Sequence, residues 1–244
     1  MSKRVIVAID GPAGAGKSTV ARRVAERLGF LYIDSGAMYR AVALWALRLG
    51  VDPGDAYRLE QLARAASIEL AGGSTRVLLN GEDVTEAIRT PEVAQAASKI
   101  SVIPGVRRAL VEQQRRMAER SSVVMEGRDI GTVVFPEAQI KVYLDASPQV
   151  RAARRLNEIR QKGETLDPET VEREIRERDQ RDRTRAEAPL AQAPDAVYID
   201  SSGLTIEQAE EAVLRLVRER TSNGNALEGA SQAGAGRTPG EGPA

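Results

Sequence analysis

Five short apolar runs, rich in β-branched residues, are spaced along the chain at residues 5–9, 30–33, 123–125, 140–144 and 196–199. Runs of this length without alternating polar residues are typical of strands buried on both faces of a sheet. Between them, apolar residues recur at helical spacing, as Val20, Val24 and Leu28 do before Gly29 ends the pattern. Strands that alternate with helices predict an α/β fold of three layers around a five-stranded parallel core sheet.

A different pattern interrupts this order in the middle of the chain. Apolar and polar residues alternate between Ile68 and Ile88, which is the period of a half-buried strand. Asn80-Gly81 separates two of these runs and is a strong hairpin signal, and Gly72-Gly73 provides a second turn. We therefore expect a small antiparallel sheet inserted into the α/β core. Helical patterns follow at residues 91–101 and 106–120.

A charged stretch lies at residues 172–185, with six Arg and five acidic residues. Such a run is usually a solvent-exposed helix with ion pairs along its surface. In a helix, however, Arg178, Asp182 and Arg185 would share one face, because they are four and seven residues apart. These three side chains are candidates for a function.

The end of the chain loses its apolar residues. A last helix is predicted over residues 206–220. After Ser222 the composition is mainly Gly, Ala, Ser and Pro, and Leu227 is the only large apolar residue. Such a segment cannot bury enough apolar surface to offset the entropy of ordering. Residues 222–244 are therefore predicted to form a disordered tail.

Composition narrows the classes of function. Lys plus Arg equal Asp plus Glu at 35 each, which argues against a protein that coats a nucleic acid polymer. Two Phe, one Trp and five Tyr are too few for base-stacking platforms. The chain has neither Cys nor His, which excludes structural zinc sites, disulfides and imidazole acid–base chemistry. Backbone dipoles, Lys, Arg, carboxylates and a metal ion remain, and this set suits phosphoryl transfer.

No apolar run is long enough for a signal peptide or a membrane span, since Asp10 interrupts the first run after Lys3 and Arg4. We therefore expect a cytoplasmic protein that binds no membrane. No long apolar patch or heptad seam is visible in the sequence, which favours a monomer.

The strongest motif directly follows the first apolar run. It fits the pattern G-x-x-x-x-G-K-S/T and consists of Gly11, Pro12, Ala13, Gly14, Ala15, Gly16, Lys17, Ser18 and Thr19. The glycines let successive N–H groups turn inward around a phosphate chain, at the positive end of the following helix. We expect Lys17 to reach the outer phosphates of ATP and Ser18 to ligate Mg²⁺. The motif indicates a protein that handles nucleoside triphosphates.

Four more motifs follow this loop: Asp34-Ser-Gly-Ala-Met-Tyr-Arg40, Ile88-Arg-Thr-Pro-Glu-Val93, Gly127-Arg-Asp-Ile-Gly-Thr-Val-Val-Phe-Pro136 and Arg178-Asp-Gln-Arg-Asp-Arg-Thr-Arg185. With these motifs the chain resembles the bacterial cytidylate kinases, P-loop nucleoside monophosphate kinases that move the γ-phosphate of ATP onto CMP or dCMP. The resemblance extends to about Arg220. The antiparallel insert resembles the extended monophosphate-binding domain of that family.

The resemblance implies a division of the chain. Residues 1–221 would form the kinase domain, whose core takes residues 1–65, 102–150 and 187–221. The monophosphate-binding insert would take about 66–101 and a helical lid about 151–186. The tail, residues 222–244, has no counterpart from which a function can be carried over.

The resemblance also implies roles for single side chains. Those that would hold the acceptor nucleotide are Ser35, Arg40, Ser98, Arg107, Arg128, Asp129, Arg178 and Asp182. Arg40 and Arg128 suit a bidentate grip on a monophosphate. Ser98, Arg107 and Asp129 would read cytosine, whose amino group donates to a carboxylate while its O2 and N3 accept. Uracil has an acceptor in place of that amino group and would be penalised.

The same resemblance implies a catalytic set of cations. Arg178, Arg181 and Arg185 resemble lid arginines that close over the phosphates, with Asp182 near the acceptor sugar. Together with Lys17 and Arg128 they would align and neutralise the transferring group.

Three acidic positions have structural alternatives. Asp34 and the following serine alone would be a helix cap, and only Arg40, one turn further on, favours phosphate binding. Glu126 either orders the waters of the magnesium ion or only caps the end of its strand. Asp10 is interpreted as structural, fixing a loop without touching the nucleotide.

The expected reaction is ATP-dependent phosphorylation of CMP and dCMP to CDP and dCDP, with Mg²⁺ as cofactor and the small-molecule substrates as partners. Residue types do not decide the preference among CMP, dCMP and UMP. One alternative is another P-loop kinase that acts on uridylate, thymidylate or a sugar. The other is a GTPase-like or ATPase-like switch, although no N-K-x-D or T-K-x-D motif that would read guanine occurs in the sequence.

Overall fold

The computed structural model describes residues 4–70, 76–161, 163 and 165–233. Its centre is a five-stranded sheet in the order β2-β6-β1-β7-β8, in which every pairing is parallel. The strands are β1 (Ile6–Asp10), β2 (Leu31–Asp34), β6 (Val123–Gly127), β7 (Ile140–Asp145) and β8 (Val197–Asp200). The predicted five-stranded parallel core is confirmed, and each strand lies within two residues of its expected bounds.

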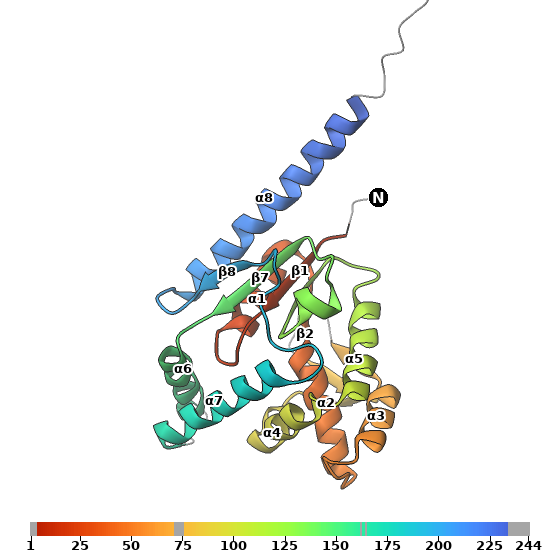
Figure 1. The fold of residues 1–244 in the computed structure, drawn as a ribbon, viewed down its shortest axis with the longest axis vertical. Coiled ribbons are helices and arrows are strands. Elements are labelled where there is room, and N and C mark those ends of the chain that lie inside the picture. Colours follow the sequence, from red (N-terminus) through yellow and green to blue (C-terminus); the bar gives the residue numbers. More distant parts are fainter. Residues whose placement is uncertain (1–3, 71–75, 162, 164, 234–244) are drawn as a thin grey trace, which may run out of the picture.

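Both faces of this sheet are covered. Successive residues of a strand point to opposite sides, so each strand contributes side chains to both faces. Val7 and Ile9 of β1 pack in one cluster with residues of α1 (Lys17–Leu28) and α8 (Ile206–Ala233). Ala8 packs on the other side, in a cluster that partly buried residues of α5 (Pro104–Met117) also contact. The carboxyl ends of the strands are flanked by α2, α6 and α7 (Figure 1).

The inserted sheet consists of β3 (Ile68–Leu70), β4 (Val77–Leu79) and β5 (Glu82–Asp83), paired antiparallel in that order. Asn80 and Gly81 have φ of 52° and 84°, the left-handed conformation that a tight two-residue hairpin requires. The predicted hairpin at this position is confirmed. The Gly72-Gly73 turn lies outside the described residues.

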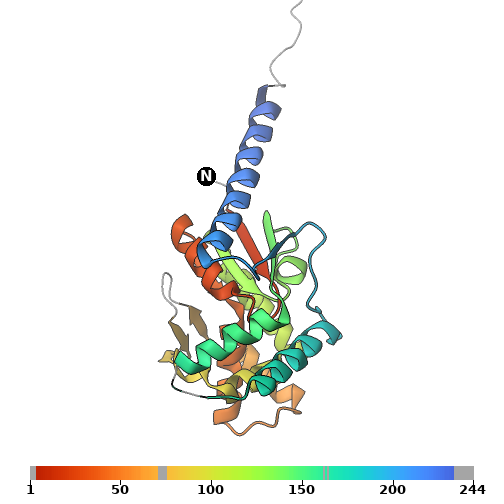
Figure 2. The ribbon, with the colours of Figure 1, turned by 90° about the vertical axis from the view of Figure 1, so that its left-hand side faces the viewer.

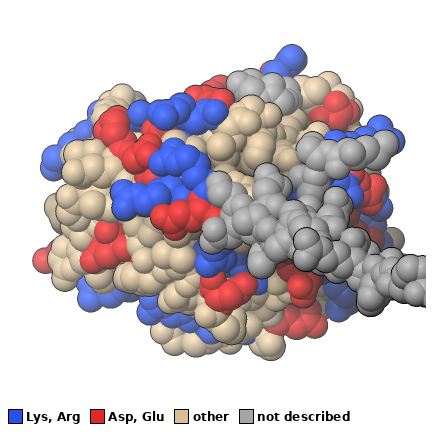
Figure 3. Space-filling view, turned by 90° about the horizontal axis from the view of Figure 1, so that it is seen from above, with Lys and Arg blue, Asp and Glu red and all other residues tan. Residues whose placement is uncertain are grey.

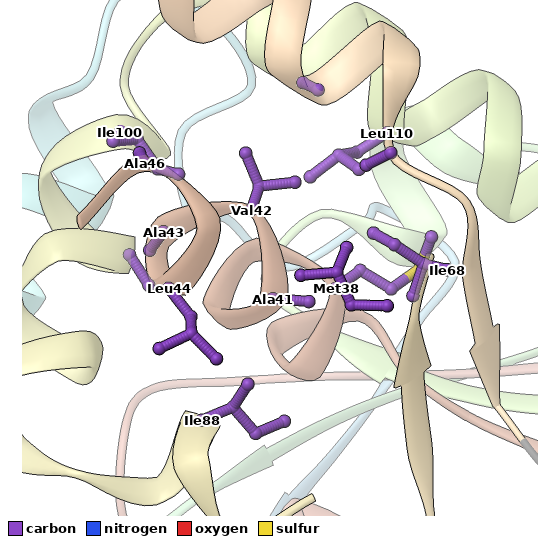
Figure 4. Packing of buried hydrophobic residues seen from close by; sticks show 14 of the residues in the cluster. Met38, Ala41, Val42, Ala43, Leu44, Ala46, Ile68, Ile88, Ile100 and Leu110 are labelled. Carbon is purple, nitrogen blue, oxygen red and sulfur yellow. The ribbon is translucent and has the colours of Figure 1, made fainter. Parts of the chain in front are cut away.

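One hydrophobic core joins the inserted sheet to four helices. The helices are α2 (Ser35–Arg48), α3 (Ala56–Ala65), α4 (Pro91–Ile100) and α5. In Figure 4, Met38 of α2 lies near Ile68 and Val42 lies near Leu110, while Leu44 points toward Ile88. Helix α3 lies in a stretch for which no element was predicted. The limits of the insert at about 66 and 101 remain a prediction.

Helices α6 (Pro148–Gln161) and α7 (Pro168–Thr184) pack against each other beside the sheet (Figures 1 and 2). Their contact includes an apolar cluster of Ala152, Ile159, Val171 and Ile175. The helix predicted in the charged run is therefore confirmed. Two short turns, η1 (Ala87–Arg89) of 3-10 type and η2 (Ile130–Val134) of π type, lie before α4 and after β6.

Arg185 departs from the prediction that it continues the face of α7. It is the residue after the helix and has an extended ψ of 141°. Its Nε donates to Ala188 O at 2.5 Å, so the side chain follows the departing chain.

Helix α8 continues to Ala233 and projects away from the rest of the molecule (Figures 1 and 2). The expectation of disorder from residue 222 is therefore wrong for residues 222–233, and residues 234–244 lie outside the described chain. Composition alone was misleading because extending an existing helix costs far less than starting one.

The surface carries charges of both signs. Figure 3 shows basic and acidic side chains interspersed on the face seen from above, in keeping with the equal numbers of the two in the sequence. Within the described ranges, no helix is both long and apolar enough to cross a membrane.

Candidate active site

The glycine-rich loop joins the end of β1 to the start of α1. Gly11 lies against β7 so closely that a Cβ there would be 1.9 Å from Leu144 O. Gly16 stands at the cap of α1 with φ of 90°, and no side chain caps the helix at this position. The first N–H groups of α1 are thus left for a ligand, and an anion is the ligand that a helix N-terminus favours.

Two arginines of α6 hold this loop from outside. Arg151 Nη1 donates to Ala13 O at 3.1 Å, and Arg154 Nη1 donates to Ala15 O at 3.2 Å. Arg151 is only 3% exposed and also pairs with Asp179 of α7 at 2.6 Å. With these carbonyl groups held by the arginines, the loop can present its N–H groups to phosphates. Neither arginine was predicted, since nothing in the local pattern separates them from their exposed neighbours.

Lys17 is buried beneath the loop. Its Nζ donates to Pro12 O at 2.7 Å. Burial, with a smaller contribution from the nearby Arg128, lowers the pKa of Lys17 to about 7. An ammonium group in this position is short of negative charge, and a phosphate would supply it.

Ser18 and Glu126 meet at the ends of α1 and β6. Ser18 Oγ donates to Glu126 Oε1 at 2.5 Å, and Tyr32 Oη donates to the same oxygen at 3.5 Å. Burial raises the pKa of Glu126, and the neighbouring Asp34 raises it too. A hydroxyl and a carboxylate side by side are hard oxygen donors that fit Mg²⁺.

A magnesium ion here would need further ligands. Among the described residues, no group of three or more His, Cys, Asp or Glu side chains could enclose a metal. Mg²⁺ commonly keeps several waters and takes the rest of its ligands from one or two protein groups and substrate phosphates. The donor set of Ser18 and Glu126 therefore fits the ion when nucleotide is present.

The start of α2 combines a helix cap with a cation. Asp34 Oδ1 accepts from the N–H of Ala37 at 2.9 Å, so the predicted cap is confirmed. The other oxygen of Asp34 pairs with Arg40 Nη2 at 2.8 Å. Ser35 is buried and its Oγ donates to Glu126 O at 2.7 Å. These contacts place Arg40 and Ser35 next to the strand end that carries Glu126.

Two neighbouring arginines differ in how well their charge is compensated, since nearby carboxylates raise the pKa of Arg128 despite its burial, whereas Arg178 is short of negative charge. Arg128 Nε pairs with Asp182 Oδ2 at 2.9 Å. Arg178 Nε is buried and has no hydrogen-bond partner within the part of the chain that is described. Burial lowers the pKa of Arg178 to about 10, and Arg128 contributes to the shift. An unpaired guanidinium N–H beside a second guanidinium fits an oxygen of a phosphate group.

Asp129 joins two arginines from different parts of the chain. Arg107 of α5 contacts one of its oxygens through Nη2, and Arg185 Nη2 lies 3.3 Å from the other. The guanidinium of Arg107 also lies over the ring of Tyr39, 5.9 Å from its centre. Arg185 therefore lies with the group expected to read the base.

Ser98 is brought to the same region by α4. Its buried Oγ accepts from Arg181 Nε at 3.3 Å. The structure thus connects Ser98, Arg107 and Asp129 to α7 and the residue after it. Their predicted contact with a base remains a prediction.

A separate cavity of about 470 Å³ lies between α7 and the ends of β7 and β8. Its lining includes Arg151, Asp179 and Tyr198. None of the residues predicted to bind nucleotide lines it, so it is distinct from the site described above.

The first strand of a parallel sheet enters an uncapped glycine loop, and a buried lysine and the under-compensated Arg178 lie beside it. These features define a P-loop protein suited to phosphoryl transfer. The family model for cytidylate kinase matches residues 7–219. The chain belongs to the cytidylate kinase family.

Curated relatives agree with this family. A cytidylate kinase of Solibacter usitatus (strain Ellin6076) is 65% identical over 224 residues, which cover 91% of this chain and 96% of the relative. A cytidylate kinase of Pelotomaculum thermopropionicum is 53% identical over 221 residues, which cover 89% and 96%. A solved shikimate kinase from Acinetobacter baumannii in complex with shikimate has a TM-score of 0.43 and 18% identity, over 91% of this chain and 95% of that one. The fold assignment rests on the strand order given above and not on this last likeness.

Proposed function

We propose that this protein transfers the γ-phosphoryl group of ATP to CMP and dCMP, which yields ADP with CDP or dCDP. The observation that carries the proposal is the convergence of Lys17, Arg128 and Arg178 beside an uncapped P-loop, where Lys17 and Arg178 have too little negative charge around them. Two phosphate groups, one from each substrate, would supply that charge.

The donor would bind along the glycine loop. The N–H groups at the start of α1 receive its phosphates, and Lys17 exchanges Pro12 O for a phosphate oxygen. Mg²⁺ held by Ser18, with Glu126 in contact or through water, would neutralise charge on the outer phosphates.

The acceptor phosphate would lie against Arg40, Arg128 and Arg178. Its attacking oxygen needs little deprotonation because a phosphate monoester is largely ionised at neutral pH, and so the absence of His is no obstacle. The arginines hold this oxygen in line with the γ-phosphate, and in a site closed to water such alignment supplies much of the rate.

The acceptor base would be read by Asp129, Arg107 and Ser98. Asp129 accepts from the amino group of cytosine, while Arg107 and Ser98 offer donors to its O2 and N3. Asp182 would lie near the acceptor sugar.

Arg181 and Arg185 would close the site over both substrates. Both already contact the base-reading residues, through Ser98 and Asp129 respectively. Movement of α7 would then exclude water as the nucleotides bind.

An ADP-release assay with ATP, Mg²⁺ and a panel of CMP, dCMP, UMP, AMP, GMP and dTMP tests this function. We expect release mainly with CMP and dCMP, and a loss of turnover by orders of magnitude in a folded Lys17→Ala variant. A preference for UMP or dTMP would indicate a different monophosphate kinase. Release that does not depend on any acceptor would indicate an ATPase or a nucleotide-dependent switch.

A further inference from the structure

The turn that follows Asp129 is held by a residue of a different strand. Turn η2 begins at Ile130, directly after Asp129. The N–H of Ile130 donates to Asp10 Oδ1 at 2.8 Å, and the N–H of Gly131 donates to Asp10 Oδ2 at 2.7 Å. Both oxygens of one buried carboxylate are thus used by consecutive N–H groups. These are the donors that the first turn of a helix leaves unpaired.

Asp129 stands at the cap position of η2, but its own side chain makes no capping hydrogen bond. Aspartate is one of the residues most favoured at that position. Here its carboxylate is turned instead to Arg107 and Arg185. Asp10 performs the capping from β1, and this leaves the carboxylate of Asp129 free to pair with Arg107 and Arg185.

We propose that Asp10 is a positioning residue for recognition of the acceptor base. By capping η2 from β1, it keeps Asp129 from capping the turn itself and holds the carboxylate of Asp129 toward Arg107. The inference rests on the proposed function, in which Asp129 accepts from the amino group of cytosine. Asp10 itself touches neither substrate.

The surroundings of Asp10 leave the turn little freedom. Asp10 is 4% exposed, and its backbone pairs with Gly127 of β6 and Tyr143 of β7. A Cβ on Gly131 would lie 3.4 Å from Asp10 Oδ2 and 3.2 Å from the side chain of Lys141, so the turn packs closely on both. The next residue, Gly11, begins the P-loop. Asp10 thereby connects the donor loop to the turn on the acceptor side.

The variant Asp10→Asn tests the proposal. The amide keeps one acceptor oxygen and turns an NH₂ group toward the other N–H, so one capping hydrogen bond is lost. The carboxylate of Asp129 can then accept from the N–H that has lost its partner. The measured quantity is the ratio of kcat/KM with CMP to kcat/KM with UMP. We expect this ratio to fall by about tenfold or more, the scale of one hydrogen bond to a charged group. The Kd of ATP, measured by calorimetry, should stay within about twofold.

Asp55→Asn is the matched control. Asp55 also caps a helix, α3, by accepting from the N–H of Arg58 at 3.0 Å, and it lies outside the site. The ratio should not change in this variant. If Asp10→Asn folds and keeps the wild-type ratio, the positioning role is wrong. A matching loss of ATP affinity would make Asp10 a general structural residue and would also overturn the proposal.

Asp129→Ala separates this inference from the proposed function. If the ratio is unchanged in Asp129→Ala, Asp129 does not read the base and the assignment on which the inference rests fails. If the ratio falls in Asp129→Ala but not in Asp10→Asn, the base assignment stands and only the role of Asp10 fails.

A measurement on the unmodified protein covers the case in which Asp10→Asn does not fold. Burial raises the pKa of Asp10 to about 6. The charged groups that influence this pKa are Asp129, which raises it, and Lys17, which lowers it, and Lys141 packs against the neighbouring Gly131. As the pH falls from about 8 to about 5.5, protonation removes one acceptor from the cap, and the ratio should fall. Effects of Lys17 on phosphoryl transfer are common to both substrates and cancel in the ratio. A ratio that is constant over this range would refute the proposal.

Discussion

Replacing Arg151 by Met removes a buried charge that joins three segments of the protein. The guanidinium donates to Ala146 O at 3.0 Å and Ala13 O at 3.1 Å, and pairs with Asp179 at 2.6 Å. Met is unbranched and of similar length, so the variant mainly loses polar contacts rather than volume. The change therefore isolates what the charge contributes to the fold and to the P-loop.

The expected loss is large because Asp179 is buried and would lose the cation that pairs with it. The Oδ1 atom of Asp179 has no hydrogen-bond partner among the described residues even with Arg151 present. Removing one member of a buried pair costs about 3–5 kcal/mol. For a protein of this size, each kcal/mol lowers Tm by about 2–4 °C, so we expect a decrease of roughly 6–20 °C.

Urea unfolding of Arg151→Met, Asp179→Asn and the double variant measures the coupling between the two residues. The double variant should be more stable than Arg151→Met, because its buried carboxylate has been replaced by a neutral amide. The KM for ATP should rise in both variants that lack Arg151, since Ala13 O is no longer held. The reasoning is refuted if the double variant is as unstable as Arg151→Met, or if Arg151→Met costs less than about 1 kcal/mol.

Two further predictions concern single residues of the site. Gly11→Ala should lower the free energy of unfolding by more than about 2 kcal/mol in thermal unfolding, because the added Cβ would lie 1.9 Å from Leu144 O at a φ of 150°. Gly203→Ala is the control: nothing lies within 4 Å of a Cβ at that position, so this variant should behave like the unmodified protein. Arg178→Ala should raise the KM for CMP by about tenfold or more in steady-state assays. Its Tm should be unchanged or higher, since the substitution removes an under-compensated buried cation. An unchanged KM would contradict the proposed contact with the acceptor phosphate.

The parts of the fold that follow from local pattern were predicted from the sequence. The five core strands are continuous apolar runs, and the Asn80-Gly81 turn has a specific backbone requirement that these two residues meet. The cap at Asp34 follows from the same kind of local chemistry. Each of these signals lies within a few residues of the structure that it specifies.

Helix α3 and the end of α8 show where local pattern was insufficient. Helix α3 did have a signal, since Asp55 caps it and Leu59 and Ala63 lie one turn apart on its buried side. The short length of the segment and the Pro53-Gly54 turn before it obscured that signal. In α8 the composition beyond residue 222 favoured disorder, but the preceding turns supply the nucleus that such a segment lacks on its own.

The side-chain network of the site could not be read from the sequence, because its partners are far apart along the chain. The Arg- and Asp-rich run of α7 has the composition of a solvated helix, and several of its charges are exposed as that composition suggests. Yet Asp179 faces Arg151 beside the P-loop, and Asp182 faces Arg128 on the side proposed to bind the acceptor. These two carboxylates are three residues apart on one helix, so the helix can respond to both substrates at once. A phosphate that competes for either arginine would weaken one of these pairs and change how α7 is held, which gives a physical basis for coupling nucleotide binding to closure of the site.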